Sequence, residues 1–269
     1  MDMAEVRIEA PAEAVRRGGS LPALRRWNAG LGGLHLVQGA LMLVLATGFS
    51  LPVTSSFLAF DPAAGKLEPQ PETLFNLRIA PLIAAFLFLS AAAHLLLATV
   101  KRRWYEEELG RGMNRARWLE YSLSSSVMMV VIAMLVGIYD VASLLLVLAA
   151  NASMILFGWL MEVQNEKRER VDWTAYWFGV LAGSVPWLAI GIYLVGAGIG
   201  PGGPPGFVYG IYGSIFVFFS AFALNMVFQY RRAGRWRDYL YGERVYMLLS
   251  LFAKSALAWQ VFAGTLRPV

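Results

Sequence analysis

One lysine, Lys254, interrupts a long apolar stretch near the end of the chain. It follows Arg244 by ten residues and precedes Arg267 by 13, which places it about 15–20 Å from either charge on a helix that rises 1.5 Å per residue. Its amine cannot reach water along its own helix, so it must be paired, neutral or covalently used. A desolvated amine is a nucleophile toward aldehydes and forms a Schiff base, whose protonated form needs a counter-charge.

Glu120 can supply that counter-charge from an earlier apolar stretch. We expect both stretches to begin on the same side of a membrane. Side chains tilt toward the start of a helix, so the long Lys254 side chain reaches toward the level of Glu120. Ser250 lies one turn before Lys254 on the same helix face. The alternative interpretation is a purely structural salt bridge between Lys254 and Glu120 that holds two helices together.

Few other ionisable residues lie in the apolar stretches. They are His35 and His94 and, nearer the ends of their stretches, Glu162 and Glu243. Ionisable groups inside a bilayer are costly and usually mark function. For the two histidines, a hydrogen bond to a neighbouring helix is as good an interpretation as proton handling.

The elements that carry these residues are membrane spans. Of the 269 residues, 58% are hydrophobic and only 15% are charged, whereas soluble domains carry about 25% charged residues. A crossing helix needs roughly 20 mainly apolar residues, and such runs recur at 29–49, 77–100, 118–139, 141–161, 173–195, 207–228 and 245–266. They are too continuous for the alternating pattern of a β-barrel. We therefore predict an all-α membrane protein, a bundle of seven transmembrane helices, with no large soluble domain.

The basic residues set the orientation of this bundle. Of the 23 lysines and arginines, 19 fall before the first span or in the links between spans 2 and 3, 4 and 5, and 6 and 7. Residues of this kind are retained on the cytoplasmic side. We predict a multi-pass protein of the cell membrane, with a cytoplasmic N-terminal tail at 1–28, a membrane domain at 29–266 and an external C-terminus. Topology and contact with the lipid bilayer then explain the net charge of +5, without nucleic acid.

The external link between the first two spans, 50–76, is the longest. Its residues 54–60 lead into the turn-forming sequence DPAAGK at 61–66, which predicts a short β-hairpin. Aromatic residues near the ends of spans usually form belts at the membrane interface. We place five tryptophans in such belts, namely Trp27, Trp104, Trp118, Trp173 and Trp236.

Two motifs connect these features with a known family. The sequences RWLEYSLSSS at 117–126 and LSLFAKSALAWQ at 249–260 put a carboxylate early in the third span and a lysine in the middle of the seventh. In this the chain resembles microbial retinal proteins, and its cytoplasmic N-terminus is similar to that of the heliorhodopsin family in particular. The resemblance implies all-trans retinal bound covalently to Lys254, with Glu120 as counterion of the Schiff base. It also implies a homodimer to which the 50–76 hairpin contributes.

The resemblance and the depth of each residue along its span assign further roles. We expect Ser250 and Ser124 beside the Schiff base. The expected retinal pocket consists of Ser125, Met128, Asn151, Met154, Ile155, Trp187, Phe219 and Phe222. A polar, water-filled cavity that could carry protons is expected from His35, His94, Ser90, Tyr121 and Gln38. A polar network on the cytoplasmic side is expected from Arg117, Glu162 and Glu243.

A light-sensing photoreceptor is the function that these residues favour. Retinal-based outward proton pumps carry a second acid 11 residues after the first one and another acid four residues before the lysine. Here those positions hold Val131 and Ser250. We therefore expect light to isomerise the retinal and drive a conformational change without ion pumping. An unidentified cytoplasmic signalling partner would read that change.

Two other functions are alternatives to the sensor. A light-gated or light-driven ion channel or transporter predicts the same colour together with a current. A retinal-free membrane protein, in which the Lys254–Glu120 pair is structural, predicts no visible absorbance. An enzyme is not expected, because the sequence has no cysteine and shows no metal-ligand cluster, Gly-rich phosphate loop or catalytic triad.

Overall fold

The structure, a computed structural model, describes residues 21–200 and 202–267. Within these residues, seven helices are long and apolar enough to cross a membrane, which confirms the predicted multi-pass helical bundle. They are α2 (Leu21–Leu45), α3 (Ile79–Ala98), α5 (Arg115–Leu135), α6 (Val141–Asn165), α7 (Thr174–Ile199), α8 (Gly206–Tyr230) and α9 (Tyr239–Val261), which continues into the π-helical turn η2 (Phe262–Leu266). Most of the predicted tail, 1–28, lies outside the described residues.

Polar side chains fix where three of the spans begin. Asn114, Asp140 and Asp238 each accept a hydrogen bond from a backbone N–H two or three residues further on, at 3.0, 2.9 and 2.9 Å respectively. These caps satisfy N–H groups that have no partner within the helix. Three spans begin at least three residues earlier than predicted, by Leu21 and at Arg115 and Tyr239, because helices continue through charged residues that a search for apolar runs excludes.

A β-hairpin joins α2 to α3 and confirms the predicted hairpin. Strands β1 (Ser50–Asp61) and β2 (Lys66–Arg78) are antiparallel and longer than the sequence suggested. The register shifts by one residue between Val53 and Thr54, and there Thr54 N donates to Tyr139 O at 2.9 Å. The hairpin is therefore attached at its base to the turn between α5 and α6.

Two short helices lie in links where none was predicted. They are α4 (Arg102–Gly110) and the 3₁₀ turn η1 (Gly234–Arg237). Tyr105 and Leu109 of α4 are buried, which fastens this charged helix to the bundle. Burial also raises the pKa of the Tyr105 hydroxyl. Hydropathy alone does not reveal α4 because five of its nine residues are charged.

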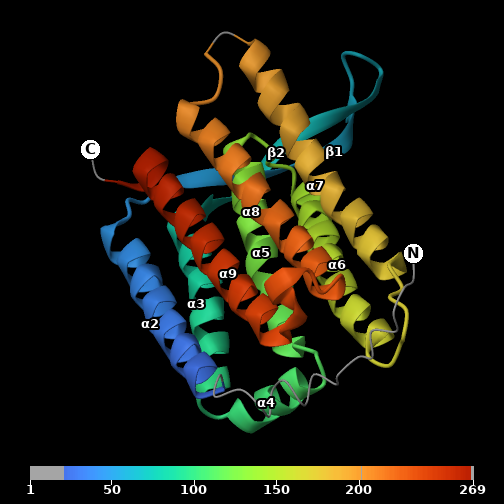
Figure 1. The fold of residues 1–269 in the computed structure, drawn as a ribbon. Helices are drawn as coiled ribbons and strands as arrows, with labels where there is room; N and C mark the ends of the chain where they lie inside the picture. The colour runs from blue at the N-terminus through green and yellow to red at the C-terminus, as the bar shows by residue number, and fades with distance from the viewer. Residues whose placement is uncertain (1–20, 201, 268–269) are drawn as a thin grey trace.

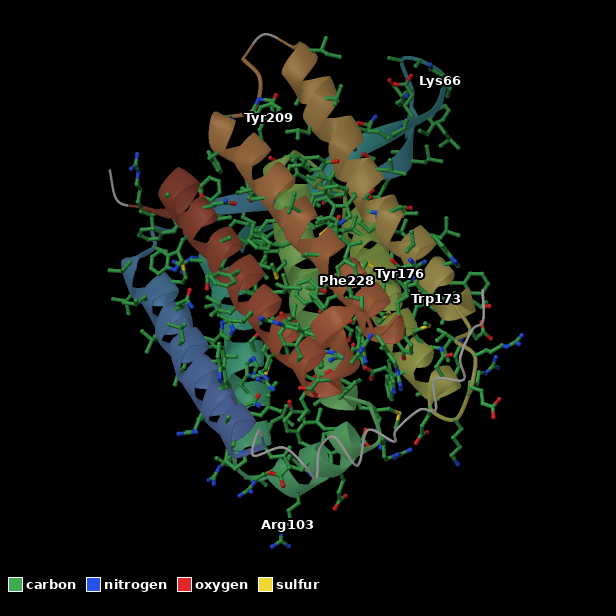
Figure 2. The ribbon with its side chains drawn as sticks, in the orientation of Figure 1. Lys66, Arg103, Trp173, Tyr176, Tyr209 and Phe228 are labelled. Atoms are coloured by element: carbon green, nitrogen blue, oxygen red, sulfur yellow. The ribbon has the colours of Figure 1, made fainter. Side chains whose placement is uncertain are left out.

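The spans surround α5, which contributes many of the largest buried side chains. Figure 1 shows α5 behind α8 and α9, with α2 and α3 to one side and α6 and α7 to the other. Met128 and Ile132 of α5 share the main apolar core with Phe86 and Leu257. The hairpin covers one end of the bundle, here called the hairpin end, while α4 and the start of α2 form the opposite, arginine end. Figure 2 marks the hairpin tip with Lys66 and α4 with Arg103.

Candidate functional site

Lys254 lies on the face of α9 that is turned into the bundle and is 3% exposed. Its Nζ donates to Glu120 Oε1 at 2.8 Å and to Ser250 Oγ at 2.9 Å. Ser250 lies one turn earlier on the same face, and Glu120 comes from the neighbouring α5. The sequence prediction that these three side chains meet therefore agrees with the geometry.

Glu120 is held from a third helix as well. Ser90 of α3 donates from its Oγ to Glu120 Oε1 at 2.6 Å, so one carboxylate oxygen accepts both a lysine and a serine hydrogen bond. The Tyr121 ring lies 4.9 Å from Lys254 Nζ, close enough for a cation–π contact. One positive and one negative group thus face each other in a buried setting, where charges are tolerated when they are paired and hydrogen-bonded.

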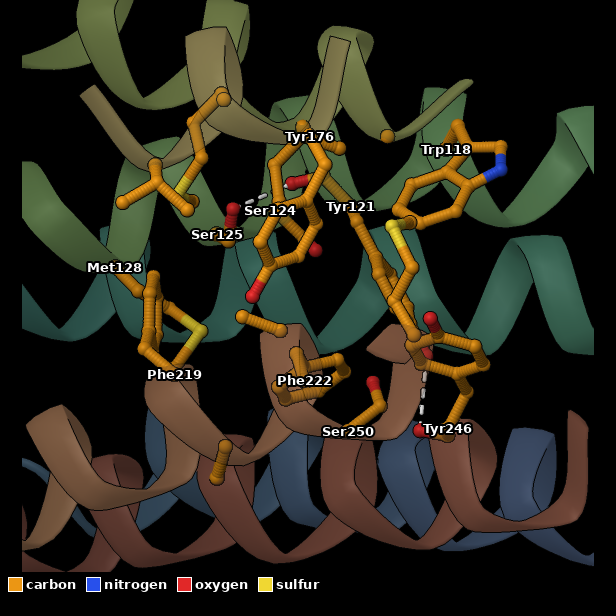
Figure 3. A pocket seen from close by; sticks show the side chains of 18 of the residues that line it. Trp118, Tyr121, Ser124, Ser125, Met128, Tyr176, Phe219, Phe222, Tyr246 and Ser250 are labelled. Carbon is orange, nitrogen blue, oxygen red and sulfur yellow. Dashed lines mark hydrogen bonds between the residues drawn. The ribbon is translucent and has the colours of Figure 1, made fainter. Parts of the chain in front are cut away.

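A largely apolar cavity opens beside Lys254, lined by α5, α6, α7, α8 and α9. Figure 3 shows its wall, with Trp118 and Tyr246 on one side and Met128 and Phe219 on the other. Of the residues predicted around the chromophore, those on the wall are Ser124, Ser125, Met128, Met154, Ile155, Phe219, Phe222, Ser250 and Lys254. The Ser124 Oγ is buried without a hydrogen-bond partner among the described residues.

Two predicted pocket residues, Asn151 and Trp187, lie one layer behind the wall. The Asn151 side-chain amide donates to Ser125 Oγ at 2.8 Å and to Ser126 Oγ at 3.0 Å. Trp187 packs edge-on against Phe219 with ring centroids 5.4 Å apart. Both residues lie at the depth of the cavity along their helices. Their side chains point to other faces of those helices, so they pack behind the residues that line the cavity.

Trp118 was not predicted to line the cavity, but it does. It was expected in an interfacial belt, yet it is 4% exposed and forms part of the cavity wall. Its indole Nε1 donates to Glu162 Oε2 at 2.7 Å, which explains why a residue near the start of a span turns inward. Its position two residues before Glu120 was the only signal in the sequence.

Several other residues that line the cavity were not predicted. The glycines among them leave space that a side chain would fill. Gly158 and Gly179 line the cavity. A Cβ at Gly158 would lie 2.5 Å from Trp118 Cζ3, and one at Gly179 would lie 3.2 Å from Phe157 Cβ. The remaining unpredicted wall residues are Ala175, Tyr176, Val180, Ala223, Met226, Tyr246 and Ala253. An apolar cavity with an amine at its wall and glycines that keep it open suits a long apolar molecule with an aldehyde group.

The residues predicted to form a polar cavity divide into separate contacts. The rings of His35 and His94 are stacked with centroids 5.9 Å apart, and His94 Nδ1 is 2.8 Å from Asn28 Oδ1. Both nitrogens of His35 are buried without a partner among the described residues. Gln38 Oε1 accepts from Trp259 Nε1 at 3.0 Å.

Two members of that predicted group belong to other parts of the site. Ser90 bonds to Glu120, as described above. The Tyr121 hydroxyl donates to Tyr246 O at 3.0 Å, and Tyr121 lines the apolar cavity. Tyr121 therefore contributes to the apolar cavity, and its hydroxyl bonds to α9 and not to either histidine.

The predicted polar network at the arginine end comes together as one cluster. Arg117 donates to Glu162 and to Glu243, and all three side chains are buried. Asn114, which was not predicted, adds bonds from its backbone N to Glu162 Oε2 at 2.9 Å and from its Nδ2 to Glu243 Oε2 at 2.8 Å. The Arg117 guanidinium carbon lies 4.0 Å from the ring centroid of Tyr246. The cluster joins α5, α6 and α9 directly next to the cavity.

The comparisons with known proteins agree with this geometry. A family model described as Heliorhodopsin matches residues 24–266 of the chain. The matched segment runs from the first turn of α2 to the end of η2 and includes both strands of the hairpin. No curated protein matches the chain.

Proposed function

The chain belongs to the heliorhodopsin family, and on that premise we propose that it is a light sensor with all-trans retinal bound covalently to Lys254. Membership of this rhodopsin family implies a retinal-binding photoreceptor in the membrane. One observation carries the finer proposal: a buried lysine amine lies at the wall of an apolar cavity and is hydrogen-bonded to a single carboxylate, Glu120.

The residues around the cavity fit the chemistry of retinal. When bound, retinal supplies the absorption of visible light and a change of shape on isomerisation. Lys254 would hold retinal through its amine, with a carbon–nitrogen double bond in place of the aldehyde carbonyl and one water released. Glu120 balances the positive charge at the nitrogen, while Ser250 and Ser124 offer hydroxyl groups beside it.

Glu120 and its neighbours determine what the proton at the Lys254 nitrogen does. An ion pair at 4 Å is worth about 4 kcal/mol at an effective dielectric constant near 20. Turning the N–H away from Glu120 would cost about that much, because two buried charges would lose their partners. A proton transfer or a helix movement that restores the pairing would then be favourable. Glu120, hydrogen-bonded to Ser90, is the nearest acceptor. His35, whose ring nitrogens have no partner among the described residues, is a candidate beyond it.

We propose that the output is a conformational change without ion pumping. Val131 and Ser250 support this, because both are buried and neither can carry a proton as a carboxylic acid does. Glu120 is the only carboxylate bonded to Lys254 Nζ among the described residues. The alternative is a light-gated or light-driven ion channel or transporter. Such a protein would need the same retinal cavity, so the cavity does not distinguish the two functions.

The proposed topology places the arginine end in the cytoplasm and the hairpin end outside. The 19 basic residues in the N-terminal segment and three of the links support it. A cytoplasmic signalling partner would then contact the arginine end, where α4 lies.

We also propose a homodimer that uses the hairpin. Leu58 and Phe60 lie on one face of β1 and are 67% and 63% exposed. Large apolar side chains exposed together usually mark a contact surface. Changing both to glutamate should convert a dimer to a monomer in size-exclusion chromatography with light scattering. If the dimer persists, the hairpin is not the contact.

The test of covalent binding is to express the protein with all-trans retinal and record the visible spectrum. Lys254→Arg is the sharpest variant, because it keeps a cation for Glu120 but cannot form the carbon–nitrogen double bond. We expect a visible band in the wild type and none in Lys254→Arg or Lys254→Ala. A band of equal strength in either variant, or none in the wild type, would overturn the proposal.

Ion transport needs a separate measurement. Cells that contain the coloured protein should show no light-driven pH change and no photocurrent under voltage clamp. A current that disappears in Lys254→Arg would favour the channel or transporter instead.

A further inference from the structure

A groove rich in arginine lies at the arginine end. It lies between the start of α2 and the start of α4 and is lined by Pro22, Arg25, Arg26, Ala29 and Arg102. Three of these five residues carry a guanidinium, and none carries an acid. Guanidinium groups bind phosphate oxygens through paired N–H donors, which favours this ligand over other anions.

Two of the arginines are held in place by their own Nε atoms. Arg25 Nε donates to Ala98 O at 3.1 Å, at the end of α3. Arg102 Nε donates to Glu106 Oε1 at 2.6 Å. Among the described residues, the outer nitrogens of both guanidinium groups have no hydrogen-bond partner, so each presents free N–H donors from a fixed position. The cost of ordering these side chains on binding is reduced accordingly.

Charge near the groove is strongly positive. Glu106 is the only acid paired with a lining residue in the described part of the chain, so three guanidinium groups face one carboxylate. The groove also lies at the start of one helix, since Arg102 is the first residue of α4. The free N–H groups at a helix start add further positive potential.

We expect the groove at the level of a membrane surface. It adjoins the ends of two spans, α2 and α3, and Trp27 next to it is 41% exposed, as expected for a residue at headgroup depth. From Ala29 the surface of α2 continues past Gly30 and Gly33, where an added Cβ would meet no atom within 4 Å. No described side chain therefore covers these two positions, and an acyl chain could lie against them.

We propose that this groove binds one anionic phospholipid, with the headgroup phosphate on Arg25, Arg26 and Arg102 and an acyl chain along α2. The charge, the guanidinium donors that no described residue occupies and the expected position at the membrane surface favour a lipid over a soluble phosphate. The proposal does not depend on retinal or on which face of the membrane the arginine end occupies.

The experiment compares Arg26→Gln/Arg102→Gln with a matched control, Arg103→Gln. Arg103 is the neighbour of Arg102 on α4 but points away from the bundle in Figure 2. Each protein is placed in nanodiscs that contain phosphatidylcholine and phosphatidylglycerol, and the lipids that stay bound are counted by native mass spectrometry. Wild type and Arg103→Gln should retain one phosphatidylglycerol. The double variant should lose about tenfold or more of that retention.

Three results would overturn the proposal. The first is equal retention of both lipids by the wild type, and the second is an equal loss in Arg103→Gln. In the third, inorganic phosphate added to pure phosphatidylcholine nanodiscs raises the unfolding temperature as much as phosphatidylglycerol does, which would assign the groove to free phosphate. Circular dichroism checks that each variant is folded. If the double variant does not fold, the single variants Arg26→Gln and Arg102→Gln should each lose part of the retention.

Discussion

The interior of this bundle contains two ionic clusters that both join α5 to α9 but differ in composition. Near the middle, one lysine faces one carboxylate and hydroxyl groups complete the bonding. At the arginine end, one guanidinium serves two carboxylates and packs against the rings of Trp118 and Tyr246 at 4.4 and 4.0 Å. The first is balanced in charge, whereas the second carries a surplus acid.

The difference separates a reactive site from a structural one. A lysine amine can lose its proton and condense with an aldehyde, but arginine stays charged and binds through a rigid planar fork. Trp118 and Tyr246 belong to both the arginine cluster and the cavity wall. We infer that the arginine cluster closes one end of the cavity. It also holds α5 and α9, the two helices that carry Glu120 and Lys254, in a fixed relative position.

The largest effect is expected from removing Arg117. Arg117→Met leaves Glu162 and Glu243 buried together without a cation, and breaking such a pair costs about 3–5 kcal/mol of unfolding free energy. Denaturation in detergent, followed by circular dichroism, measures this. Lys254→Met is the matched comparison and should cost less, because it strands only one carboxylate, which can be protonated. A greater cost for Lys254→Met would reverse our assignment of the two clusters.

A spectral change should mark the central pair alone. In the retinal-loaded protein, Glu120→Gln removes the negative partner of the chromophore charge and should shift the visible band to the red. The shift in excitation energy should reach at most about 4 kcal/mol, the worth of one ion pair at 4 Å. Glu162→Gln is the control and should move the band much less. Equal shifts in both variants would mean that Glu120 is not the dominant counter-charge.

A smaller loss of stability should follow from changing Trp118. Trp118→Phe keeps an aromatic ring in the wall but removes the indole N–H that Glu162 accepts. Glu162 Oε2 keeps its bond from Asn114 N, so the variant loses one of two hydrogen bonds to a charged group, worth about 1.5–3 kcal/mol. Trp173→Phe is a suitable control, because Trp173 has no hydrogen bond through its indole among the described residues. Equal melting temperatures for the two variants would show that this bond contributes little.

The smallest effect concerns an exposed ion pair that serves as a reference for the buried ones. Arg111 Nε donates to Glu166 Oε1 at 2.9 Å, and this bond lowers the pKa of the Glu166 carboxyl below its ordinary value of 4.5. A lowered carboxyl pKa stabilises the fold above the ordinary value, and this contribution disappears as the pH falls through the folded value. Glu166→Gln, which leaves the bond from Arg111 to Glu108 in place, should therefore lower the melting temperature slightly at pH 7 and not at all in strong acid. A difference that grows in acid would contradict this sign.

The sequence was informative about depth in the membrane. The seven spans, the hairpin turn at 61–66 and the shared level of Lys254 and Glu120 follow from hydropathy, turn residues and spacing. Each of these depends on position along the chain, which a single sequence records directly.

Direction around a helix was harder to predict. The spans are apolar on most sides, so the pattern does not show which face meets which neighbour. Asn151 and Trp187 were predicted at the right depth but lie behind the wall, while Trp118 was placed in a belt and lies in the wall. Tertiary bonds decide these cases, such as that of Trp118 to Glu162. The short helix α4 was missed because its charges hide its few buried residues.

The closure of the bundle has a practical consequence. Thr47 N donates to Leu266 O at 2.8 Å, so the last turn of the chain is tied to the segment that follows α2, and Gln38 and Trp259 bridge the same two helices. The first and last crossings are therefore neighbours, yet an odd number of crossings leaves Leu21 and Leu266 at opposite ends of the bundle. Fluorescent labels near these two residues would lie on opposite sides of a membrane. Each would report changes on its own side, although both belong to the same pair of neighbouring helices.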